Sequence, residues 1–350
     1  RVNSSRSING WLCVQGLIGL IGLLAFAWLF SENRGGVRVK QLAIALFIQV
    51  VLAYVLLNVG FFRHALLSLN EIVYAMEAAT REGTRLVFGF LGGDTNLPFE
   101  LTGDSMPYIF AFRVLPQILV FSVVVALLWH WRVLPIVIRG FSWVLRRSLG
   151  VGGAVGVAAS ASVFLGMVEA PLIIRAYLRN LSRSELFVVM TCGMSTVAGS
   201  IMVLYANVLT RVIDGAIGHV LTASVVNVVG AVLVSRVLIP EERITEGGDL
   251  ADALSYESSM DAVARGTVDG VRLVVNVGAM VIVLMSLVGL VNYMLGNFMV
   301  SGEPLTLQWL VGWVFAPIAW IMGVDWVDAQ TAGALLGTKL ILNELVAYLE

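Results

Sequence analysis

Two carboxylates inside long apolar segments are the residues of this chain best suited to chemistry. Glu169 lies in a run rich in Gly, Ala and Ser, and Glu344 lies in the last apolar run together with Lys339. A carboxylate at membrane depth costs at least ~2.5 kcal/mol on insertion scales, so such residues usually face a cavity and mark a substrate or ion path. The alternative is a structural ion pair. Glu344 and Lys339 are poor partners within one helix, because five residues turn it by about 140°.

The elements that hold these carboxylates belong to a membrane protein. Of the 350 residues, 59% are hydrophobic and only 13% are charged, whereas soluble chains are nearer half apolar and a quarter charged. A soluble core cannot absorb so much apolar surface. Several uncharged runs are about as long as a membrane-spanning helix. These runs are 11–30, 41–62, 114–131, 216–235 and 273–295.

Two further apolar segments carry helix-breaking residues in their middle. They occupy residues 150–175 and 307–326. We predict that Gly166 and Pro171 break the first, which has arginines at both ends, and that Pro317 and Gly323 break the second, which has acidic flanks. A segment that returns to the side it entered is a re-entrant hairpin. Two such segments in matching halves indicate a secondary transporter. The predicted fold is an all-α polytopic membrane protein, an inverted-repeat transporter with two re-entrant helical hairpins and broken helices.

The orientation of the chain follows from its Lys and Arg residues, which favour the cytoplasmic side. Basic residues follow the first and third runs, whereas the link 63–107 is net acidic. We therefore predict a multi-pass protein of the bacterial inner (plasma) membrane with a periplasmic N-terminus. The predicted domains are N-terminal scaffold spans with interfacial helices (1–148), a first half of the transport domain with a hairpin and two spans (149–240), a cytoplasmic link with an amphipathic helix and a scaffold span (241–300), and the second hairpin with the span that carries Glu344 (301–350).

Several other functions are disfavoured by the residue pattern. The net charge is -1 and no basic block is present, which disfavours a nucleic-acid partner. His64, His130 and His219 are scattered without metal-ligand spacing, and no nucleophile–base pair stands out. We therefore expect neither an enzyme nor an organic cofactor. Asparagines inside apolar runs are expected to hydrogen-bond between helices. They are Asn207, Asn227, Asn276 and Asn292.

The end of the chain resembles a known family. "GTKLILNELVAY" is similar to the signature of concentrative nucleoside transporters, Gly-x-Lys-x3-Asn-Glu-Phe-Val-Ala-Tyr, with Leu345 in place of the Phe. "EAPLIIRAYLRNLSRSELFVVM", "VLPQILVFS" and "NVGAM" also resemble pieces of that family, in order along the chain. The resemblance implies a homotrimer in the lipid bilayer with scaffold helices and a mobile transport domain. It also implies uptake of nucleosides such as uridine, driven by sodium or protons.

The resemblance also implies which residues bind the nucleoside. The family's first hairpin tip reads Gly-Gln-Thr-Glu, whereas this chain has Met167, Val168 and Glu169 after a glycine, so only the glutamate matches. The family's second glutamate, which contacts ribose hydroxyls, matches Glu344. Its neighbour Asn343 is expected at the same site. One further residue, Ile201, is expected to form an apolar wall for the base.

A sodium site is implied in the same way. The family's site combines the first hairpin with the point where the next span unwinds. The matching positions are Ser162 and Leu165 in the hairpin and Thr196 and Val197 at the unwound point. Thr196 keeps a hydroxyl, and Ser162 stands where the family has Asn. Oxygen ligands from side chains and unwound backbone suit a hard cation, so sodium is favoured over a proton as the coupling ion.

Two other functions stay open beside nucleoside symport. Met167 and Val168 are apolar where the family has hydrogen-bonding side chains, which favours a modified nucleoside or a nucleobase as the solute. The sequence ends at Glu350, before the last span of the family. If that span is absent, we expect an incomplete site, and the second alternative is a truncated, non-transporting membrane protein.

Overall fold

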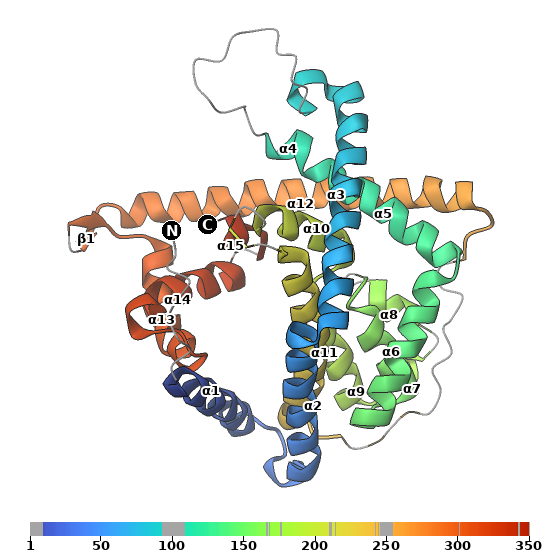
Figure 1. Cartoon of the computed structure of the whole chain (residues 1–350). Coiled ribbons are helices and arrows are strands. Elements are labelled where there is room, and N and C mark those ends of the chain that lie inside the picture. The colour runs from blue at the N-terminus through green and yellow to red at the C-terminus, as the bar shows by residue number, and fades with distance from the viewer. Residues whose placement is uncertain are drawn as a thin grey trace. The chain divides into compact units, whose positions relative to one another are not determined.

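The structure is a computed structural model whose described residues are almost entirely helical. It describes residues 10–92, 109–165, 167, 169–175, 177–209, 212–213, 215–241, 243, 245, 255–300, 302–341 and 344–349. In these residues the only strands are β1 (Met299–Val300) and β2 (Glu303–Pro304), which pair antiparallel. The predicted all-α fold is confirmed. The chain divides into two compact units, one formed by Glu32–Gly278 and the other by Arg1–Ser31 with Ala279–Glu350 (Figure 1).

The larger unit is built around one buried helix, α11 (Ala216–Leu238), which packs against α2, α3, α9 and α10. The other helices of the unit are α2 (Val39–Asn58), α3 (Gly60–Phe88), α4 (Phe110–Arg113), α5 (Leu115–His130), α6 (Val133–Leu149), α7 (Gly153–Ala161), α8 (Glu169–Ile173), α9 (Arg183–Ser195) and α10 (Gly199–Leu209), with short 3-10 turns at η1 (Arg34–Gly36), η2 (Gly89–Gly92) and η3 (Leu178–Asn180). The helix α12 (Ser259–Leu295) begins in this unit and continues into the other.

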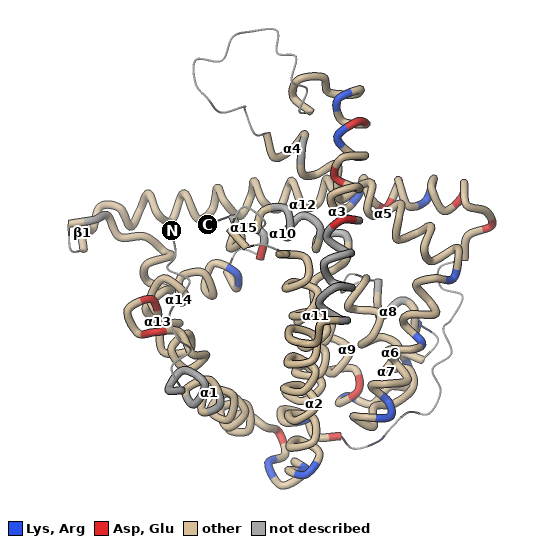
Figure 2. Tube along the Cα trace, viewed as in Figure 1, with Lys and Arg blue, Asp and Glu red and all other residues tan. Residues whose placement is uncertain are grey.

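The long apolar runs of the sequence are helices in the structure. Within the described residues, four helices are long and apolar enough to cross a membrane, or five if a bent pair is counted as one span. The four are Val39–Asn58, Phe110–His130, Ala216–Leu238 and Ser259–Leu295. They match four of the predicted runs, and α1 (Gly10–Leu29) covers the remaining one. Figure 2 shows Lys and Arg residues of the larger unit gathered around the start of α2 and along α6.

The first interrupted segment breaks where the sequence predicted, although Pro171 is not the cause. The helix α7 ends at Ala161, and α8 begins at Glu169. Pro171 lies in the first turn of α8, where a missing N–H removes no helical hydrogen bond. The prediction that Pro171 breaks the segment is therefore wrong, and the break precedes it. Gly166 lies outside the described residues.

The second interrupted segment is a helical hairpin in the smaller unit, formed by α13 (Leu307–Ile321) and α14 (Trp326–Ile341), which are bent by 117°. The turn contains Gly323 at a φ of 103°, a conformation that strongly favours glycine. The prediction that Gly323 breaks this segment is therefore confirmed. The prediction that Pro317 breaks it is wrong, because Pro317 lies inside an unbroken α13. The proline ring removes one backbone hydrogen-bond donor from the helix. Pro317 nevertheless lies on an exposed face of α13, and the helix continues to Ile321.

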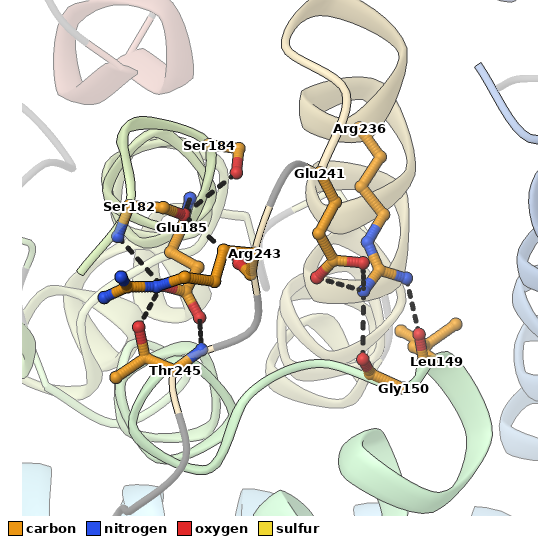
Figure 3. Close-up of polar contacts among 9 residues, drawn as sticks. All are labelled: Leu149, Gly150, Ser182, Ser184, Glu185, Arg236, Glu241, Arg243 and Thr245. Atoms are coloured by element: carbon orange, nitrogen blue, oxygen red, sulfur yellow. Dashed lines mark hydrogen bonds and ion pairs between the residues drawn. The ribbon is translucent and has the colours of Figure 1, made fainter. Parts of the chain in front are cut away.

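A polar cluster at one end of the larger unit fixes the chain that follows α11 (Figure 3). The buried carboxylate of Glu185, in the first turn of α9, accepts hydrogen bonds from the backbone N–H of Ser182 at 2.9 Å and of Thr245 at 2.6 Å. It also accepts from the Thr245 hydroxyl at 2.6 Å. The Ser182 hydroxyl in turn accepts from the Glu185 N–H, which completes a capping box. The start of α9 therefore holds the linker that comes sixty residues later.

A second contact of this cluster comes from Arg236 in the last turn of α11. Its guanidinium donates to both carboxylate oxygens of Glu241, at 3.0 and 3.1 Å, and to the backbone carbonyls of Leu149 and Gly150 (Figure 3). Both charged side chains are largely buried. Losing either would leave the other charge buried and uncompensated, which is strongly destabilising. This pair joins the ends of α6 and α11 to the linker.

Glycines allow α13 and α14 to pack backbone against backbone. A Cβ added at Gly333 would lie 2.7 Å from the amide nitrogen of Ala316, and one added at Gly312 would lie 2.8 Å from the carbonyl oxygen of Gln330. Real Cβ atoms essentially never approach so closely. Small residues at helix contacts are the usual means of association in membranes, and here they set the spacing of the hairpin.

We predict that Gly333→Ala destabilises the protein, because α13 and α14 must move apart to admit the methyl group. Overpacking of this kind costs about 1–3 kcal/mol, and the midpoint of thermal unfolding in detergent should fall. The matched control is Gly289→Ala in α12, where an added Cβ meets nothing within 4 Å. The control should unfold at the wild-type temperature or slightly above it, since Ala favours a helix by about 1 kcal/mol over Gly. Equal midpoints for both variants would contradict this packing.

Candidate functional site

Two non-helical segments meet inside the larger unit. One is the gap between α7 and α8, and the other is the gap between α9 and α10. The hydroxyl oxygen of Thr196 lies 2.8 Å from the carbonyl oxygen of Ser162, and the N–H of Gly199 donates to the carbonyl of Phe164 at 3.0 Å. A Cβ at Gly199 would lie 2.7 Å from that same carbonyl. The glycine therefore permits the two gaps to touch, and the predicted unwinding of the chain at Thr196 is confirmed.

The contact at Thr196 is rich in oxygen. Its hydroxyl oxygen is also 2.9 Å from the carbonyl of Cys192. A hydroxyl carries one proton, so it can donate to only one of the two carbonyls at a time. Three oxygens thus lie together, and the Ser195 hydroxyl is a second donor to the Cys192 carbonyl, at 3.2 Å. Hard cations such as Na⁺ prefer oxygen ligands of this kind, so the residues present fit a sodium ion.

Ser162 takes part in this contact through its backbone. The residue is buried, and its own hydroxyl donates to the carbonyl of Ala159 at 2.8 Å, back into α7. Its carbonyl oxygen faces the Thr196 hydroxyl. The structure therefore brings Ser162 and Thr196 together as the sequence predicted, and it offers the carbonyl of Ser162, not the hydroxyl, to this contact.

Of the other two predicted cation-site residues, Leu165 is buried and Val197 is half-buried. Leu165 is 2% exposed. Val197 packs against an apolar cluster that includes Met202, Ile217 and Val220. With apolar side chains directed into the core, only the backbone oxygens of these residues are suited to bind a cation. Whether they do so stays a prediction.

The helix α11 also contacts the gap between α9 and α10. Ser224 accepts a hydrogen bond from the N–H of Val197 at 3.1 Å, and the amide of Asn227 donates to the carbonyl of Ser195 at 3.0 Å. The predicted interhelical bonding is confirmed for Asn227 and for Asn292, whose side chain donates to Gln308 and accepts from Leu307. Sequence reasoning missed Ser224, because a serine in an apolar helix carries no local signal of its partner.

The predicted nucleoside-binding residues of the larger unit lie next to this gap. Met167 sits between α7 and α8, is 61% exposed, and approaches α9 closely enough that a Cβ added at Gly193 would lie 3.2 Å from the Cβ of Met167. Glu169 is the first residue of α8, and Ile201 lies half-buried in the first turn of α10. Val168 and the side chain of Glu169 lie outside the described residues.

Glu344 has a matching local position in the smaller unit. It is half-buried and is the first described residue of α15 (Glu344–Leu349), which follows α14 along the chain. Lys339 is exposed in the last turn of α14. Asn343 lies outside the described residues.

Comparisons with known proteins cover nearly the whole chain. Residues 18–91 match the family model "Na+ dependent nucleoside transporter N-terminus", residues 111–211 match "Nucleoside recognition", and residues 219–350 match "Na+ dependent nucleoside transporter C-terminus". The three matches follow one another in the order expected for a single transporter chain.

Individual relatives agree with these models. The chain is 34% identical to the uncharacterized transporter YutK of Bacillus subtilis, over 95% of this chain and 80% of YutK. It is 30% identical to the nucleoside permease NupC of Helicobacter pylori, over 95% of this chain and 78% of that one. The solved structure of CNTnw in an inward-facing substrate-bound state is 33% identical and has a TM-score of 0.87, with 97% of this chain and 80% of that chain covered. The chain therefore belongs to the Na⁺-dependent, concentrative nucleoside transporter family, whose members are transporters and not enzymes.

Proposed function

We propose that this protein is a secondary active transporter that imports nucleosides by symport with sodium. The observation that carries the proposal is the oxygen-rich contact between Thr196 and Ser162, where the two non-helical segments meet. The family name supports sodium as the coupling ion. Ser162, Leu165, Thr196 and Val197 would hold the ion through oxygen atoms, and no cofactor is needed.

Coupling between ion and nucleoside follows from the same contact. A bound cation supplies positive charge between the carbonyl of Ser162 and the hydroxyl of Thr196, which ties the hairpin of α7 and α8 to the gap before α10. Met167 and Glu169 belong to that hairpin, so ordering it prepares the nucleoside-binding residues. By linkage, the nucleoside raises the affinity for the cation by the same factor. Neither solute then binds well alone.

We further propose a role for each substrate-binding residue. Glu344 accepts hydrogen bonds from the ribose hydroxyls, with Asn343 beside it, and Glu169 accepts from the nucleobase directly or through water. Apolar side chains line the base, and they are Met167, Val168 and Ile201. Uridine is the substrate of first choice for testing these roles.

The arrangement in the membrane is also a proposal. The segments α7–α8 and α13–α14 would be re-entrant hairpins of opposite sidedness, because their flanking charges differ in sign. The basic residues around the start of α2 and along α6 (Figure 2) support a cytoplasmic location for these two segments of the larger unit. We propose a homotrimer in the bacterial inner membrane with a periplasmic N-terminus.

One observation favours a second candidate substrate. Met167 is apolar and 61% exposed, whereas the family has a hydrogen-bonding side chain at this position. A base with fewer polar groups, as in a modified nucleoside or a free nucleobase, would suit it. Competition of labelled uridine uptake by a panel of nucleosides and bases separates the two candidates, because the better substrate competes at the lower concentration.

We predict that Glu344→Gln cuts uptake strongly. Hydrogen bonds to a charged group contribute about 1.5–3 kcal/mol, so the efficiency of uptake should fall by about tenfold to a hundredfold. The initial rate of labelled uridine uptake into proteoliposomes, normalised to the amount of protein, measures the effect. Glu82→Gln is the control, since that carboxylate on α3 has a side chain 77% exposed. Wild-type rates in Glu344→Gln would sink the assignment of this residue to the substrate.

A further inference from the structure

The gap between α9 and α10 is held from two directions. The hairpin of α7 and α8 meets it through Thr196 and Gly199, as described above. The helix α11 meets it through Ser224 and Asn227, which are three residues apart and so share one face of that helix. Ser224 is 1% exposed, and α11 is the most buried of the candidate spans in the described part of the chain. The contacts from α11 therefore come from a fixed support.

These two bonds restrain both peptide groups that flank Thr196. The carbonyl of Ser195, which accepts from Asn227, belongs to the peptide group before the Cα of Thr196. The N–H of Val197, which donates to Ser224, belongs to the peptide group after it. Peptide groups are planar and rigid, so fixing both of them fixes φ and ψ of Thr196, here -105° and 157°. The direction of its Cα–Cβ bond, and hence the reach of its hydroxyl, follows from those angles.

We propose that Ser224 and Asn227 are positioning residues for the coupling cation. They touch no ion themselves. They hold the backbone of Thr196 so that its hydroxyl stays within reach of the Ser162 carbonyl before any ion arrives, which removes an ordering cost from cation binding. The inference rests on the sodium symport proposed above. It assigns to α11 a part in cation affinity, beyond its part in packing.

The test measures sodium binding without transport. Purified protein is unfolded thermally at increasing NaCl, with choline chloride keeping the ionic strength constant, and the sodium concentration that gives half of the stabilisation is recorded. Ser224→Ala should raise that concentration by about fivefold, the effect of one lost hydrogen bond of average strength. Ser224→Thr keeps a hydroxyl and should restore the wild-type value. Asn227→Ala serves as a second variant, because Asn227 is exposed and its truncation leaves no cavity.

Ser235→Ala is the matched control. Ser235 lies on the same helix, is 0% exposed, and its hydroxyl has no hydrogen-bond partner among the described residues. The control should keep the wild-type sodium dependence even if its unfolding temperature without sodium changes. An effect of Ser235→Ala equal to that of Ser224→Ala would mean that any lost hydroxyl on α11 weakens binding, which overturns the proposal.

A double-mutant cycle tests the route of action. If Ser224 acts through Thr196, Ser224→Ala should have little further effect on sodium dependence in a Thr196→Val background, whereas independent effects would add. Additive effects, or an unchanged sodium dependence in both Ser224→Ala and Asn227→Ala, overturn the positioning role while leaving symport intact. A wild-type protein that sodium does not stabilise contradicts the proposed cation site itself, and the positioning role with it.

Discussion

The structure depends on one constraint, which is that backbone groups released where a helix unwinds must find partners inside the protein, because lipid offers none. The gap between α9 and α10 meets this constraint with groups from two sides. The hairpin of α7 and α8 supplies the carbonyls of Ser162 and Phe164, and α11 supplies Ser224 and Asn227. Because these bonds hold the gap, the chain can expose oxygens there without losing its fold. A cation site of backbone oxygens becomes possible at this position for the same reason.

Glycines make these close approaches geometrically possible. Gly199 lets the gap touch Phe164, and Gly193 lets α9 approach Met167. In the smaller unit, Gly312 and Gly333 do the same for α13 and α14. In each case a methyl group would need space that backbone or Cβ atoms already occupy. A hairpin built from larger residues would stand further from its neighbours, and the polar groups at its break would lose the partners they have here.

Much of the fold was predictable from the sequence, whereas the site was predictable only in part. Long apolar runs predicted the candidate spans, since burial in lipid needs little beyond length and hydrophobicity. Gly323 predicted its turn, but Pro317 and Pro171 showed that a proline on an exposed face or in a first helical turn need not end a helix. The gap at Thr196–Ala198 contains neither Pro nor Gly. Only the family resemblance predicted it, because the gap is stabilised by tertiary hydrogen bonds that Thr196 and Val197 donate to Ser162 and Ser224, and no local propensity shows those bonds.

We propose that sodium binding where the two helix breaks meet drives nucleoside uptake. The most direct measurement is accumulation of labelled uridine in proteoliposomes that have an inward sodium gradient, compared with equal sodium on both sides and with an inward proton gradient alone. Sodium symport predicts uptake beyond the outside concentration only with the sodium gradient. That accumulation should disappear when a sodium ionophore dissipates the gradient. Accumulation driven by the proton gradient, or uptake that is the same without sodium, would contradict sodium symport.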